Sequence, residues 1–142
     1  MDLFPTPRSL VLTGGAGPPV ATPVEHEDGP SLAPQGFRLT VGEGDAGRVV
    51  LRSADALGRR YGEDVLDQLR AAHPGGLPAL DVDDQPDLVE RAFHLDISRD
   101  RVPRMDDLRG LVELLRRARF TQLQLYTEHT FAYAAHPEVW AA

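Results

Sequence analysis

The chain contains no cysteine and no lysine among its 142 residues. Without thiols it forms neither disulfides nor thiolate metal sites, and a reducing compartment is compatible with the composition. No apolar run approaches the roughly 18–20 residues that a membrane span needs. The start of the chain also lacks the basic segment and long apolar core of a signal peptide. We therefore expect no membrane association and a cytoplasmic location.

The chain also has fewer basic than acidic residues, and the acidic excess is distributed unevenly along the sequence. Residues 1–90 carry 15 acidic residues and 7 Arg, whereas residues 91–142 carry 7 acidic residues and 8 Arg. The acidic first part argues against binding to nucleic acid, whose phosphates attract basic side chains. The change of balance near residue 90 indicates two domains. We place them at 1–86 and 87–142, with the acidic stretch 81–87 expected to be a linker.

The first part of the chain predicts a small α+β layer. Residues 8–13, 37–41 and 49–52 have strand patterns, and the Gly- and Pro-rich residues 13–36 are expected to form a loop. A helix capped by Ser53 or Asp55 follows, with apolar residues at three- and four-residue steps; Gly58 and Gly62 either weaken it or allow close packing. Residues 77–82 predict an edge or entry strand, because Pro78 lacks the N–H that a central ladder needs.

The glycines at residues 42–47 match the dinucleotide-binding pattern G-x-G-x-x-G. That motif needs a strand before it and a helix after it, so that phosphates meet a helix N-terminus. Here the β-branched Val49 and Val50 follow directly, so a hairpin loop is expected instead. We expect no nucleotide and no other cofactor.

The second part predicts a strand, a helix and a second strand. Phe93, Leu95 and Ile97 alternate with polar residues, helical spacing begins near Pro103, and residues 120–126 have a strand pattern. A crossover of this length makes the two strands parallel. Ligands of parallel α/β folds bind beyond the C-terminal ends of the strands. Those ends carry the titratable residues Asp96, Arg99, Tyr126, Glu128 and His129.

Residues 90–140, which begin "ERAFHLDISRDRVPRMDDLRG", resemble the opening of the catalytic barrel of family 20 glycoside hydrolases, the β-N-acetylhexosaminidases. The resemblance is narrower to a bacterial branch with the patterns R-G-x-x-L-D-x-S-R-x-x-V-P and Q-L-Q-L-Y-x-E-H-T-F-A-Y. Upstream, "GFRLTV" and "LPALDVDDQPD" resemble the zincin-like α+β domain that precedes this barrel. The implied fold is a small zincin-like α+β domain at 1–86, followed at 87–142 by the first βαβ unit of a truncated (β/α)₈ TIM barrel.

The resemblance also implies a chemistry. Family members remove terminal N-acetylhexosamine with retention, and the substrate's acetamido oxygen acts as nucleophile beside an Asp-Glu pair at the end of the fourth barrel strand. No residue of this chain matches that pair, so no catalytic residue is assigned. The resemblance implies substrate-binding roles for Arg91, Glu128 and His129, with Ala92 in place of the usual Gly. It implies no metal.

Simpler roles compete with these assignments. Arg91 can form a salt bridge with a neighbouring acid, and Asp96 on a strand is expected to have a structural partner, because an unpaired buried charge is costly. Glu128 and His129 can anchor a loop by hydrogen bonds. A metal site from His94, Glu128, His129 and His136 lacks the spacing of known zinc motifs.

Length limits what the chain does alone. A (β/α)₈ barrel needs about 250 residues, whereas residues 91–142 hold two strands and one helix. We therefore expect an N-terminal fragment of a β-N-acetylhexosaminidase-like enzyme, inactive by itself, whose full-length protein binds N-acetylhexosaminides. The alternatives are a non-enzymatic carbohydrate-binding or interaction module, and one piece of a split enzyme that receives the missing barrel portion in trans.

Overall fold

The computed structural model describes residues 2–99, 102–128 and 132–139, and the chain divides into two compact units. The N-terminal unit spans Met1–Val89 and the C-terminal unit spans Glu90–Ala142. The division lies three residues beyond the boundary that the sequence predicts.

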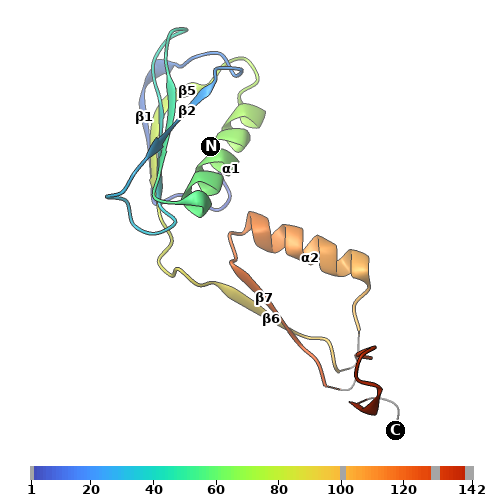
Figure 1. Cartoon of the computed structure of the whole chain (residues 1–142). Coiled ribbons are helices and arrows are strands. Elements are labelled where there is room, and N and C mark those ends of the chain that lie inside the picture. Colours follow the sequence, from blue (N-terminus) through green and yellow to red (C-terminus); the bar gives the residue numbers. More distant parts are fainter. Residues whose placement is uncertain (1, 100–101, 129–131, 140–142) are drawn as a thin grey trace. The chain divides into compact units, whose positions relative to one another are not determined.

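A five-stranded mixed sheet forms the N-terminal unit (Figure 1). Its strands are β1 (Ser9–Ala16), β2 (Val24–Asp28), β3 (Phe37–Val41), β4 (Val49–Ser53) and β5 (Pro78–Asp84), in the spatial order β1-β5-β3-β4-β2. Neighbouring strands are antiparallel except β2 and β4, which are parallel. The predicted hairpin is confirmed, because β3 and β4 pair across the glycine-rich loop, where Gly44 has a φ of +71°.

One face of this sheet packs against helix α1 (Ala56–Ala72) and forms the hydrophobic core. The strands supply it by alternation: Phe37, Leu39 and Val41 are buried, whereas Arg38 between them is exposed. The helix begins at Asp55, whose carboxylate accepts a hydrogen bond from the N–H of Gly58 at 2.8 Å, so the predicted cap is confirmed. The apolar residues that α1 buries are Tyr61, Val65, Leu66 and Leu69.

Two glycines let α1 approach the sheet closely. A Cβ atom at Gly58 would stand 2.3 Å from the carbonyl oxygen of Gly36, and one at Gly62 would stand 2.3 Å from Cδ1 of Leu51. Of the two interpretations that the sequence left open for these glycines, the structure supports close packing.

The loop expected over residues 13–36 is wrong in part. β1 continues to Ala16, and residues 24–28 form β2 at one edge of the sheet. Side chains reinforce the pairing of β2 with β4: Nε of Arg48 lies 2.7 Å from Oε1 of Glu25, and Nε of Arg52 lies 3.1 Å from Oε2 of Glu27. The sequence of β2 is mostly charged, so it lacks the apolar alternation that identifies a strand.

The expectations for residues 77–87 also need correction, because β5 lies between β1 and β3 rather than at an edge. Pro78 pairs with Ala16 of β1, and the ladder to β3 begins only at Leu80, so the missing N–H leaves that ladder intact. β5 also continues to Asp84, so more than half of the predicted linker is strand. Asp84 is buried and accepts hydrogen bonds from the backbone N–H groups of Arg8, at 3.1 Å, and Gln85, at 3.0 Å.

The face of the sheet opposite to α1 carries polar side chains. One row runs across all five strands in register and consists of Ser9, Asp83, Arg38, Arg52 and Glu27. In this row Arg38 pairs with Asp83, and Arg52 pairs with Glu27. The two arginines that meet across β3 and β4 are therefore each flanked by a carboxylate.

The C-terminal unit contains β6 (Ala92–Asp96), α2 (Met105–Arg117), β7 (Gln122–Tyr126) and the short 3-10 helix η1 (Pro137–Val139). β6 and β7 pair in parallel, from Ala92 opposite Gln122 to Asp96 opposite Tyr126, so the predicted βαβ unit is confirmed. Figure 1 shows α2 running alongside the two strands. Within the described ranges, no helix combines the length and the apolar character required to cross a membrane.

This unit leaves much of its apolar surface uncovered. Leu115 of α2 is buried, whereas Phe93 on β6 is 36% exposed, Leu125 on β7 is 41% exposed and Val112 on α2 is 52% exposed. Parallel strands in folded proteins are usually covered on both faces. The β6–β7 pair therefore presents surfaces of the kind that parallel sheets bury against further strands and helices.

Candidate functional site

Polar side chains gather where β6 and β7 end. Asp96 is the last residue of β6 and lies opposite Tyr126, the last residue of β7. Because the strands are parallel, the residues that follow them emerge at the same end, as predicted. The residues of this strand-end cluster are Asp96, Ser98, Arg99, Tyr126 and Glu128.

Asp96 holds the turn after β6. Its Oδ1 atom accepts hydrogen bonds from the backbone N–H of Ser98, at 2.8 Å, and from the hydroxyl of Ser98, at 2.6 Å. The hydroxyl of Ser98 is the main cause that lowers the pKa of Asp96, followed by the Ser98 N–H; the charge of Arg99 acts in the same direction. These contacts support the interpretation of Asp96 as a residue with a structural partner.

Arg99 reaches the ends of both strands. Its Nε lies 3.4 Å from Oδ2 of Asp96, and its Nη2 lies 3.7 Å from Oε1 of Glu128. Glu128 also accepts a hydrogen bond from the hydroxyl of Tyr126, at 3.0 Å. This bond, together with the negative charge of Glu128, raises the pKa of Tyr126. The ring of His94 lies 6.0 Å from the Tyr126 ring, between centroids.

Arg91 lies at the other end of the strand pair. Its backbone N–H donates to Oγ1 of Thr121 at 2.9 Å, and its Nε donates to the carbonyl oxygen of Arg119 at 2.7 Å. Arg119, just after α2, has a φ of 61°, a conformation uncommon outside glycine. Arg91 precedes β6 and Glu128 follows β7, so the backbone of the pair separates them. Sugar binding by Arg91 stays a prediction.

Two further predictions concern the polar residues near the C-terminal end of the chain. His129 lies outside the described residues. Over residues 2–99, 102–128 and 132–139, no group of three or more His, Asp or Glu side chains is arranged to hold a metal ion.

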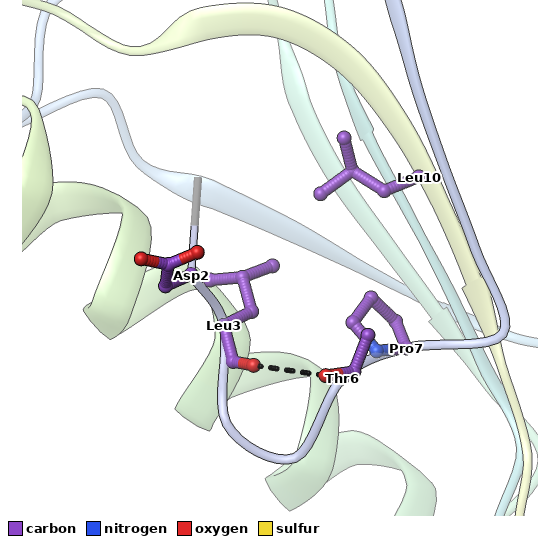
Figure 2. A pocket seen from close by; sticks show the side chains of 5 residues that line it. All are labelled: Asp2, Leu3, Thr6, Pro7 and Leu10. Carbon is purple, nitrogen blue, oxygen red and sulfur yellow. Dashed lines mark hydrogen bonds between the residues drawn. The ribbon is translucent and has the colours of Figure 1, made fainter.

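Two surface hollows of the N-terminal unit lack comparable chemistry. Figure 2 shows one of them, lined by Asp2, Leu3, Thr6, Pro7 and Leu10, in which the Thr6 hydroxyl donates to the Leu3 carbonyl at 3.5 Å. Its lining offers a single ionisable side chain and no opposing base. A second hollow lies at the start of α1, beside Asp55 and Arg59. Asp55 is engaged in capping and Arg59 pairs with Glu63 at 3.0 Å, so both have structural roles.

Sequence reasoning assigned no role to Ser98 or Arg99. A signal was present, because both follow the first strand directly at the end where ligands bind in parallel folds. What the sequence does not contain is the direction of the Arg99 side chain, which the turn at Ser98 sets.

Comparison with solved structures identifies the fold. The chain matches a β-N-acetylhexosaminidase at 26% identity and a TM-score of 0.74, over 95% of this chain and 29% of that one. It matches a family 20 β-N-acetylglucosaminidase at 19% identity and a TM-score of 0.73, over 96% and 34% of the two chains. It matches a Vibrio harveyi family 20 enzyme in complex with N-acetylglucosamine at 13% identity and a TM-score of 0.71, over 95% and 27%.

No protein-family model matches the chain, and no curated protein matches it. The match to a solved β-N-acetylhexosaminidase shows that the mixed sheet and two helices have the fold of part of a glycoside hydrolase. More particularly, the resemblance to family 20, the β-N-acetylhexosaminidases, is confirmed. The chain spans about a third of the length of these solved structures.

Proposed function

We propose that this chain supplies the small domain and the first barrel segment of a β-N-acetylhexosaminidase-like glycoside hydrolase. Residues 1–86 form the zincin-like domain, and residues 87–142 form the first two strands and the first helix of a (β/α)₈ barrel. The observation that carries the proposal is the structural match to a β-N-acetylhexosaminidase across both units of the chain. The strand-end cluster supports it, because active sites of such barrels lie at the C-terminal ends of the strands.

The proposed reaction is hydrolysis of terminal N-acetylhexosaminides, with retention and with participation of the substrate's acetamido group. This chain provides one wall of that active site. Glu128 and His129 bind substrate hydroxyls after the second strand, and Arg91 is the third substrate-binding candidate. The acid/base residue belongs to later strands of the barrel. A similar structure holds N-acetylglucosamine, which supports this class of substrate.

The exposed apolar surface of the C-terminal unit supports assembly with further barrel strands. Phe93 and Leu125 project from a two-stranded parallel sheet, and each strand has one edge without a partner strand among the described residues. The strands that cover these surfaces are carried either on the same polypeptide or on a second one.

A complementation assay tests the proposal. The purified chain with a chromogenic N-acetylglucosaminide should give no turnover above the buffer rate. Mixing it with the complementary part of a family 20 enzyme, from which the matching segment has been removed, should restore turnover. Glu128→Gln should then raise KM by roughly tenfold, the worth of one hydrogen bond to a charged group. Glu113→Gln, the same change at an exposed glutamate of α2 that pairs with Arg116, serves as the matched control.

Two outcomes count against the proposal. Enzyme-like turnover by the chain alone contradicts the need for further strands. Cooperative unfolding of the isolated chain, together with sugar affinity that the complementary part does not change, favours a non-enzymatic carbohydrate-binding module instead.

A further inference from the structure

We infer that Arg99 is a positioning residue, which bridges the carboxylates at the ends of β6 and β7 and fixes where Glu128 presents its oxygens to a hydroxyl-bearing ligand. The nature of that ligand rests on the proposed function. The bridge itself rests on the geometry of this chain alone.

The turn after β6 sets the direction of Arg99. Because Asp96 accepts both the N–H and the hydroxyl of Ser98, the backbone between these residues is held in one conformation. Arg99 is the next residue, and two different nitrogens of its guanidinium face the two acids: Nε faces Asp96 and Nη2 faces Glu128. A planar guanidinium suits this division between two carboxylates, whereas the ammonium of lysine is a single point of charge.

Glu128 is restrained from two sides. The Tyr126 hydroxyl, at the end of β7, donates a hydrogen bond to Oε1 of Glu128. Arg99 Nη2, from the turn after β6, forms an ion pair with the same oxygen. A free glutamate side chain loses up to about 2 kcal/mol of rotamer entropy when it is fixed. A carboxylate that is already held in place has less of this cost left to pay when a ligand binds.

The bridge contributes to position more than to stability. The side chain of Arg99 is 70% exposed, and ion pairs at such positions stabilise proteins by little. A variant without the guanidinium is therefore expected to fold, and any change in the cluster will report on geometry rather than on unfolding.

Tyr126 provides a direct readout of the bridge. The chain has only three tyrosines, so a chain labelled with ¹³C at tyrosine Cζ gives three signals by NMR. The charged and titratable groups that act on or lie beside Tyr126 are Glu128, Asp96, Arg99 and His94. Glu128 raises the pKa of Tyr126, whereas the hydrogen bond from Arg99 lowers it.

The first experiment is a pH titration of the labelled chain. Glu128→Gln should lower the pKa of Tyr126 towards its ordinary value, and Arg99→Met should raise it further, because the competing cation is gone. Arg109→Met is the matched control, since Arg109 is an exposed arginine of α2 whose partner is Asp106. An unchanged Tyr126 titration in Arg99→Met overturns the inference.

The second experiment adds N-acetylglucosamine to the same labelled chain, mixed with the unlabelled complementary part of a family 20 enzyme. The Tyr126 signal should shift with the sugar, the half-saturating concentration should rise by up to about fivefold in Arg99→Met, the range of an exposed ion pair, and Arg99→Lys should recover part of the loss. Equal sugar binding by the wild type and Arg99→Met overturns the positioning role and leaves the proposed function intact. If the Tyr126 pKa responds to Arg99→Met while the sugar moves no tyrosine signal even in the mixture with the complementary part, the bridge stands and the proposed function fails.

Discussion

Among the described residues, α1 in the N-terminal unit has six buried residues, whereas α2 in the C-terminal unit has one, Leu115. The strands differ in the same way. Leu39 and Leu51 are fully buried in the N-terminal unit, whereas Leu125 on β7 is 41% exposed. A mixed sheet with one helix encloses a core by itself, but two parallel strands with one helix do not.

The difference does not come from the helices. Apolar residues recur along α2 at helical spacing just as they do along α1, and they include Met105, Leu108, Val112 and Leu115. Of these, Met105 is 62% exposed and Val112 is 52% exposed. An amphipathic pattern therefore predicts that a helix has a face to bury, but the extent of burial depends on the layers that surround it.

The largest expected difference between the two units comes from a pair of leucine truncations. Leu51→Ala should destabilise the N-terminal unit by about 2–5 kcal/mol, because the fully buried side chain leaves a cavity. Leu125→Ala should cost under about 1 kcal/mol, since its site is already open to solvent. Urea unfolding, followed by residue-resolved amide exchange, measures each unit separately. Equal costs for the two changes would erase the distinction between the units.

A pair of glycine substitutions sharpens the same contrast. Gly62→Ala should destabilise by about 1–3 kcal/mol, because the new Cβ would stand 2.3 Å from Leu51 Cδ1. Gly110→Ala in α2 should stabilise that helix by about 0.5–1 kcal/mol, because nothing lies within 4 Å of the added atom. Amide exchange and the helical circular dichroism signal of each variant provide the measurement. A loss of stability in Gly110→Ala would show that α2 is closely packed after all.

A third prediction concerns the cap of α1. Asp55→Ala should cost about 1–2 kcal/mol, because the carboxylate accepts hydrogen bonds from the N–H of Gly58 in the first turn and from the N–H of Gln35. Burial acts to raise the pKa of Asp55, but hydrogen bonds from the backbone N–H groups of Gly58, Gln35 and Leu57 outweigh it, so the pKa is lowered. A lowered pKa contributes stability that is present above the ordinary aspartate pKa of about 3.9 and is lost as the pH falls through the folded value.

The pH dependence therefore gives the cap a second measurement. The free energy of unfolding of the wild type should decrease as the pH falls below about 4, and this part of the decrease should be smaller in Asp55→Asn. Asp106→Asn is the matched control, because Asp106 lies in the first turn of α2 and its side chain is 91% exposed. The same acid dependence of the free energy of unfolding in wild type and Asp55→Asn would show that the cap does not contribute to it.

Apolar periodicity was sufficient to predict several elements of the fold. The β3–β4 hairpin, α1 with its Asp55 cap and the parallel β6–α2–β7 unit all follow from local patterns. β2 was missed because cross-strand pairs, Glu25 with Arg48 and Glu27 with Arg52, accompany its pairing in place of apolar burial. The interior position of β5 was missed because a proline limits a ladder only at its own residue.

The candidate site was predictable to a similar extent. Strand direction was enough to place Asp96, Tyr126 and Glu128 at one end of the parallel pair. The role of Arg99 depends on a turn geometry that spacing alone does not encode. Substrate binding by Arg91, Glu128 and His129 stays a prediction, and so does the cytoplasmic location.

The outer face of the five-stranded sheet affects how the protein meets charged molecules in solution. Three ion pairs cover it: Arg38 with Asp83, Arg48 with Glu25 and Arg52 with Glu27. Because each guanidinium lies beside a carboxylate, their fields largely cancel within a Debye length, about 8 Å at physiological ionic strength. Asp81, which accepts a hydrogen bond from Thr40, is a further carboxylate on this face, so most of the net charge of −7, rather than all of it, comes from other surfaces. A charged molecule that diffuses towards the protein is therefore steered only weakly by this face.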